Sequence, residues 1–159
     1  MDNESSCFTE NKKELKEAIR QLVLSTNPRV FGTAAFNSYA SLERGRSTLG
    51  RAYGQIDRKI LGPSFKNIPN EDRTFFIAFP ERISTNLHYH FYIRPPAGKL
   101  DLFMKEAPRI WKKICPSGDL HLDLILFETD LRKGSYYITK DCFIERNFEN
   151  FIISTEFCF

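Results

Sequence analysis

Apolar residues recur along this chain with two different periods, and each period predicts a different kind of element. Between residues 11 and 26 the apolar positions are three or four apart, with charged residues between them, which is typical of an amphipathic helix. From residue 86 to 94, aromatic and β-branched residues dominate and favour an extended strand. The same two patterns, interrupted by Pro, Gly and Asn, divide the rest of the chain into alternating elements.

These patterns predict four helices and five strands. Pro80 is expected to end the second strand, so that residues 81–86 form the turn of a hairpin, and Pro108 is expected to break or kink the third helix. The order α-β-α-β-β-α-β-α-β indicates an α+β fold, an antiparallel sheet of about five strands with flanking helices. The helices are expected at residues 11–26, 39–61, 99–114 and 130–146. The strands are expected at residues 29–37, 74–79, 86–94, 119–127 and 151–157.

The length and composition fit a single folded domain. Residues 1–9 are expected to form an N-terminal lead-in and residues 10–159 one domain, since 159 residues can bury a sizeable core. A hydrophobic content of 42% and an aromatic content of 14% exclude a disordered tail. No apolar run approaches the ~20 residues that span a bilayer, and the four cysteines form no Cys-x-x-Cys pair. We therefore expect a cytoplasmic protein with free thiols and no membrane partner.

Two of the three histidines, His88 and His90, lie one apolar residue apart in the expected strand at 86–94. Because side chains on a strand alternate between faces, both imidazoles should point the same way, while Tyr89 and its apolar neighbours point into a core. Two imidazoles on one face can bind a metal ion if a neighbouring segment supplies a third ligand. The same pair is also compatible with the exposed face of a half-buried strand. His121, on another expected strand, is expected to be structural.

The expected helix at 130–146 carries Tyr136, Tyr137 and Lys140. Residues three and four apart share a helix face, so Lys140 neighbours both tyrosines. A nearby cation favours the phenolate form of a tyrosine, and an activated tyrosine oxygen can form a covalent intermediate. Most Tyr-x-x-Lys pairs are surface neighbours without a catalytic role, so this pair indicates a function only together with the histidine strand.

Three stretches, in this order, resemble the motifs of the HUH endonuclease superfamily, rolling-circle replication initiator (Rep) type. Residues 31–37 (FGTAAFN) are similar to the first motif, a buried strand, although they contain more small residues than usual. Residues 88–90 (HYH) resemble the metal-binding His-hydrophobic-His motif, and residues 137–141 (YITKD) resemble the Tyr-x-x-Lys-Asp/Glu signature. The resemblance covers about residues 29–145 and implies an HUH-type (ferredoxin-like) catalytic domain.

The resemblance also implies a metal site. In that family two histidines and a third polar residue hold a divalent ion, which here would be Mn²⁺ or Mg²⁺ on His88, His90 and Glu81. Glu81 lies seven residues before His88, in the place where the family's third ligand is often a Glu. A solvated carboxylate in the turn is the alternative role for Glu81.

The implied activity is site-specific nicking and rejoining of single-stranded DNA in the replication of a plasmid, phage or other mobile element. Tyr137 would attack phosphorus and form a 5′-phosphotyrosine, with Tyr136 as the alternative nucleophile, and Lys140 would neutralise the phosphate. Because no helicase motif follows, a host helicase is an expected partner beside the single-stranded origin or nick site.

The net charge of +3 predicts weak non-specific DNA binding, concentrated on one face. Two other functions remain open. One is a transposase or relaxase of the same superfamily, and the other is a module that binds single-stranded nucleic acid by base stacking without cutting it. The residues expected to contact DNA phosphates are Arg44, Arg46, Arg51, Arg94, Arg132 and Lys133.

Overall fold

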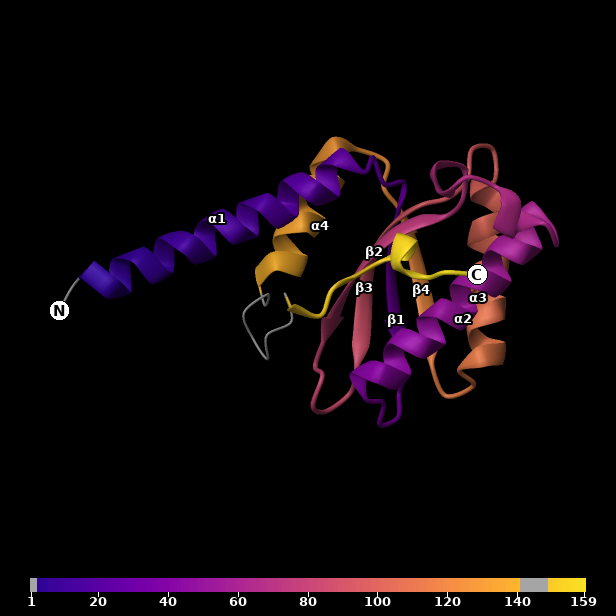
Figure 1. The fold of residues 1–159 in the computed structure, drawn as a ribbon, viewed down its shortest axis with the longest axis horizontal. Coiled ribbons are helices and arrows are strands. Elements are labelled where there is room, and N and C mark those ends of the chain that lie inside the picture. The colour runs from indigo at the N-terminus through magenta and orange to yellow at the C-terminus, as the bar shows by residue number, and fades with distance from the viewer. Residues whose placement is uncertain (1–2, 141–148) are drawn as a thin grey trace.

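The computed structural model describes residues 3–140 and 149–159, with side chains at 12–136 and 149–159. The fold is α+β: a five-stranded antiparallel sheet in the order β4-β1-β3-β2-β5, with helices on both faces (Figure 1). This confirms the predicted fold class. The helices are α1 Asn3–Ser25, α2 Leu42–Leu61, α3 Leu100–Ile114 and α4 Glu128–Lys140. The strands are β1 Val30–Ala35, β2 Phe75–Glu81, β3 His88–Arg94, β4 Asp119–Leu124 and β5 Ile152–Ile153.

Helix α1 and strand β5 differ most from the sequence prediction at their ends. Helix α1 begins at Asn3, so the described part of the expected lead-in is helical, and this end of α1 projects away from the sheet (Figure 1). Strand β5 is shorter than expected, because a 3₁₀-helix takes over at Ser154–Glu156. Residues 141–146, expected to complete the last helix, lie outside the described residues.

Strand β2 continues through Pro80, which was expected to end it, and therefore includes Glu81. The reason is that β5 pairs only with Ile77 and Ala78, so that β2 is an edge strand at Pro80. A proline has no N–H to donate, and an edge position tolerates this. Helix α3 is likewise continuous through Pro108.

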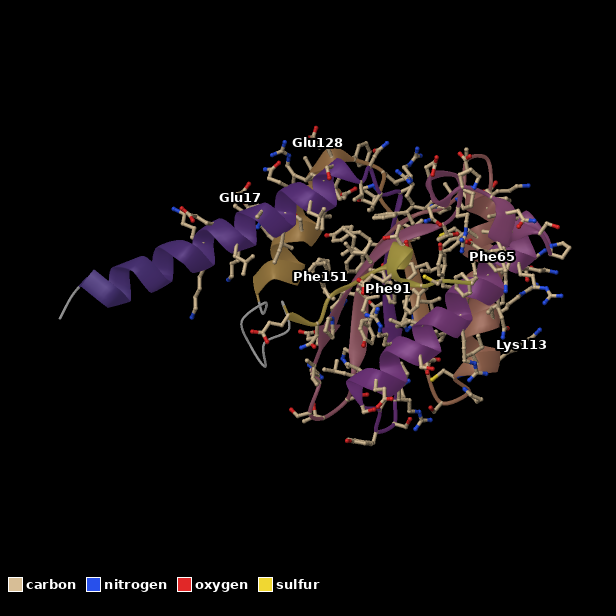
Figure 2. All side chains as sticks on the ribbon, in the orientation of Figure 1. Glu17, Phe65, Phe91, Lys113, Glu128 and Phe151 are labelled. Carbon is tan, nitrogen blue, oxygen red and sulfur yellow. The ribbon has the colours of Figure 1, made fainter. Side chains whose placement is uncertain are left out.

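The two faces of the sheet are covered unequally. Helices α2 and α3 cover one face, where Ala34, Tyr89 and Phe91 are buried (Figures 1 and 2). Helices α1 and α4 cover only part of the other face, over a smaller cluster that includes Ile77 and Tyr92. On the remaining part of that second face most side chains are half-buried or exposed, and His90 is buried. In the described residues no helix is long and apolar enough to cross a membrane.

The small residues of β1 allow close packing on the covered face. A Cβ at Gly32 would lie 3.0 Å from Leu122 Cδ2 and 3.3 Å from Ile93 Cδ1, and Ala34 is fully buried. The unusual composition of this strand therefore reflects its central place between β4 and β3 under the helices.

A buried ion pair ties α2 to the segment that leads into β2. Arg73 Nε donates to Asp57 Oδ2 at 3.1 Å, and the Thr74 backbone N–H donates to Asp57 Oδ1 at 3.4 Å. Burial raises the pKa of the Asp57 carboxyl, and its hydrogen bonds with Thr74 and Arg73 act in the opposite direction. The Arg73 guanidinium also lies over aromatic rings at 5.1–5.3 Å from their centroids, those of Tyr53, Phe65 and Phe159.

Replacing Arg73 with Met should therefore destabilise the fold strongly. The substitution leaves a fully buried carboxylate without its counter-ion, which typically costs about 3–5 kcal/mol. Urea unfolding followed by circular dichroism measures this loss. The double variant Arg73→Met with Asp57→Asn should recover part of the lost stability, because the uncompensated charge is gone. An Arg73→Met variant whose free energy of unfolding is within about 0.5 kcal/mol of the parent's would contradict the structural role of the pair.

Candidate functional site

The β2–β3 hairpin brings Glu81 and the two histidines onto one face of the sheet. Glu81 pairs with His88 across the hairpin, and β1 places Thr33 opposite His90. The rings of His88 and His90 have centroids 6.5 Å apart. Tyr89, between them, is fully buried on the α2–α3 side. The predicted orientation of the strand residues is therefore confirmed.

The imidazole of His90 is held by three neighbours. Its Nε2 lies 2.8 Å from Glu81 Oε2, and its Nδ1 lies 3.1 Å from Thr33 Oγ1. The ring of Phe31 is stacked on it, with centroids 5.9 Å apart and planes 19° from parallel. Residues 31–37 were predicted to lie on a buried strand, but Thr33 was not predicted to be part of the site. The available signal was the alternation along β1, which puts residues 31, 33 and 35 on the face opposite Ala34.

His88 is half-buried in the same face. Burial lowers the pKa of its imidazole below the usual value, and the positive charge of Arg82 acts in the same direction. Its Nδ1 is buried and has no hydrogen-bond partner among the described residues. His88 is therefore neutral at neutral pH, which is the form of histidine that binds metal ions. Arg82 is exposed in the hairpin turn, next to Glu81, and was not among the predicted site residues.

One carboxylate and two imidazoles suit a divalent ion with open coordination positions. Two neighbouring ligands of an octahedral ion, each at about 2.1 Å, lie about 3 Å apart, and Glu81 Oε2 and His90 Nε2 are 2.8 Å apart. Within the described residues, no three His, Cys, Asp or Glu side chains are assembled as a metal-binding group. The structure thus places the three predicted ligands on one face and brings two of them into contact.

If Glu81, His88 and His90 hold Mn²⁺, replacing Thr33 with Val should weaken its binding. A histidine that binds a metal through Nε2 carries its proton on Nδ1, and the Thr33 hydroxyl can accept that hydrogen bond. Loss of such an outer partner typically reduces metal affinity by about 10–100-fold. Titration with Mn²⁺, followed by electron paramagnetic resonance of the free ion, measures the change. Thr33→Ser keeps the hydroxyl and should bind normally; equal affinity in the Val variant would exclude this role.

His121 lies on the same face, on the other side of Thr33 from His90. In the sheet Thr33 pairs with His121 of β4 and with His90 of β3. The His121 side chain is exposed and is not part of the core.

Helix α4 runs back from the end of β4 over the same face of the sheet (Figure 1). A Cβ at Gly134 would lie 2.5 Å from Tyr92 Oη, so this glycine permits close contact with β3. Beside Gly134, α4 and the sheet border an open pocket of about 390 Å³. Phe31, which stacks on His90, is part of the pocket wall. The pocket and the histidine pair are therefore neighbours.

The structure describes the side chain of only one of the two candidate tyrosines, Tyr136. Tyr136 is 59% exposed, with the Arg20 guanidinium 4.0 Å from its ring centroid, and so faces α1. The side chains of Tyr137 and Lys140 lie outside the described residues. The backbone at position 137 is helical, three residues after Gly134 and four after Lys133, both of which line the pocket. Helical spacing places position 137 on the same side of α4 as these two residues.

The basic residues expected to bind DNA do not share one face. Arg44, Arg46 and Arg51 belong to α2, on the covered side of the sheet, whereas Arg132 and Lys133 belong to α4 on the opposite side. Arg46 is paired with Glu156 at 2.7 Å and Arg132 with Glu128 at 2.6 Å. Arg94, at the end of β3, lies over the Phe75 ring. The local sequence pattern could not predict this division, because it does not specify which face of the sheet each helix covers.

Comparison with known proteins provides no assignment. No family model, curated protein sequence or solved structure matches this chain. A functional conclusion therefore has to rest on the site itself.

Proposed function

We propose that this protein is a metal-dependent endonuclease that nicks and rejoins single-stranded DNA through a tyrosine-linked intermediate. One observation carries the proposal: α4, the helix with the Tyr-x-x-Lys sequence, lies over the sheet face that carries Glu81, His88 and His90. The Phe31 side chain lines the pocket beneath α4 and also stacks on the His90 ring. A nucleophile from the helix and metal ligands from the strands could thus act on one phosphate.

The strands would provide the cation site. Mn²⁺ or Mg²⁺ on Glu81, His88 and His90 would act as a Lewis acid toward the scissile phosphate. The neutral His88 imidazole and the fixed His90 ring are suited to such binding. Arg82, exposed beside Glu81, is available for a contact to the adjacent phosphate.

The helix would provide the nucleophile. The oxygen of Tyr137 loses its proton and forms a bond to phosphorus, while the bond from phosphorus to the 3′-oxygen breaks and that oxygen takes up a proton. The products are a 5′-phosphotyrosine and a free 3′-OH, and the reverse attack rejoins the strand. Lys140 would balance the negative charge on the phosphate. Rolling-circle replication of a mobile element, in the cytoplasm and with a host helicase, is the process that such chemistry would serve.

The second candidate function is a non-cleaving module that binds single-stranded nucleic acid. The direct contact between Glu81 and His90 favours it, because this carboxylate is already satisfied without a metal. Exposed apolar side chains after β4, such as Phe127, would provide stacking surfaces for bases.

A covalent adduct separates the two functions. The protein is incubated with a labelled, diverse pool of single-stranded DNA and Mn²⁺, and the mixture is run on a denaturing protein gel. The nickase predicts a shifted, labelled band that requires the metal. Clear binding of the pool by the folded protein, without any adduct, would favour the binding module instead.

A further inference from the structure

The pocket between α4 and the sheet provides a place for a base next to the histidine pair. We propose that this pocket binds one unstacked nucleobase of single-stranded DNA, with a preference for guanine. The inference rests on the DNA substrate of the proposed function but not on cleavage. The cavity of about 390 Å³ falls within the range of about 300–1,000 Å³ that is usual for small-molecule sites.

The walls of the pocket offer apolar surface for the face of a base. Phe31 and Tyr92 line it from the sheet, and Leu124 and Ile125 line it from the end of β4. Tyr92 is 1% exposed, and its hydroxyl is buried against Gly134 without a hydrogen-bond partner among the described residues. Burial raises the pKa of this hydroxyl, so it stays protonated. The half-buried ring of Phe31 therefore offers the stacking surface, and such a ring stacks on any base, which explains binding but not the choice of base.

The polar residues of the pocket explain the choice of base. Asp123 and Lys133 line it, and neither side chain has a hydrogen-bond or ion-pair partner in the described part of the chain. Asp130 is partly engaged, because its Oδ2 accepts the Phe127 N–H at 3.2 Å. A carboxylate accepts two parallel hydrogen bonds, and guanine presents two neighbouring donors, N1–H and N2–H. Guanine also offers the O6 and N7 acceptors to a lysine, so it suits Asp123 and Lys133 together.

The segment that borders the pocket is unusually apolar for an exposed one. Leu124 is 46%, Leu126 69% and Phe127 67% exposed. These residues are consecutive or nearly so, and clustered exposed apolar side chains mark interaction sites. Neighbouring bases of the same strand could stack there. Because Phe31 connects the pocket to His90, a base bound in the pocket would determine which phosphate of the strand lies at the histidine pair.

Binding of short oligonucleotides without metal tests the inference. The probes are a fluorescein-labelled oligothymidine and the same oligonucleotide with one central guanine, adenine or cytosine, measured by fluorescence anisotropy in EDTA. The guanine probe should bind at least about tenfold more tightly than oligothymidine, as expected for a bidentate base contact. Asp123→Asn should remove this preference. Asp119→Asn is the control outside the pocket: it removes the same charge from the other end of β4, where the Asp119 carboxylate is paired with Lys112 at 3.2 Å.

Each result separates this inference from the proposed function. Equal affinity for all four probes, or a guanine preference that survives Asp123→Asn, would overturn the base pocket. A guanine preference that depends on Asp123, without any covalent adduct in Mn²⁺, would support the pocket and reject the nickase. Adduct formation without any base preference would support the nickase and reject the base pocket. If the folded protein binds no probe at all, the base pocket is rejected, and the adduct gel with the diverse DNA pool decides separately on the nickase.

Discussion

Replacing Tyr137 with Phe should abolish the covalent protein–DNA adduct while DNA binding persists. The phenylalanine ring keeps the size of the side chain but has no oxygen to attack phosphorus, so no phosphotyrosine can form. The loss should be complete rather than partial, because the proposed chemistry has no second route to a covalent bond. A denaturing gel with labelled single-stranded DNA and Mn²⁺ measures the adduct, and fluorescence anisotropy measures binding on the same preparation.

Tyr136→Phe is the matched control for this experiment. It removes the same hydroxyl from the adjacent position of α4, but Tyr136 is exposed and lies beneath the Arg20 guanidinium, on the side of the helix that faces α1. Adduct formation should therefore be unchanged. An adduct that disappears in Tyr136→Phe and persists in Tyr137→Phe would assign the nucleophile to the other tyrosine. An adduct that persists in both single variants and in the double variant would exclude a tyrosine nucleophile at these positions.

The sequence was informative where structure depends on local periodicity. The alternation from Leu87 to Ile93 predicted that His88 and His90 share a face, and the structure confirms it, because the pleat of a strand leaves no other arrangement. The helical period likewise predicted α2 with its exposed arginines. Both predictions concern residues within one element, where the backbone geometry alone determines direction.

Contacts between elements were not predictable in the same way. Thr33 meets His90 across 57 residues of sequence, because β1 pairs with β3 in one particular register. No local pattern contains that register. Pro80 shows the opposite difficulty: the residue type suggested the end of a strand, whereas its edge position in the sheet permits the strand to continue to Glu81. This correction has a functional consequence, since a strand position directs Glu81 toward His90 more firmly than a turn would.

Replacing both His88 and His90 with Gln should abolish metal binding and adduct formation together. Glutamine keeps a polar side chain of similar length on the sheet face, so the fold should persist, but it is a poor ligand for a divalent ion compared with imidazole. Loss of a partner outside the ligand shell already costs about 10–100-fold in metal affinity, so loss of two ligands should cost at least about 100-fold. Titration with Mn²⁺ and the adduct gel measure the two effects, with circular dichroism as the check on folding.

His121→Gln makes this test specific. His121 lies on the same face of the sheet, opposite Thr33 on the side away from His90, so the control changes the same residue type on the same surface. It should leave both Mn²⁺ affinity and adduct formation unchanged. If the double variant binds Mn²⁺ normally while His121→Gln does not, the cation site lies on β4 instead of β3. If the folded double variant still forms a metal-dependent adduct, the histidine pair is not the metal site. The His-Tyr-His sequence then no longer supports the proposed chemistry.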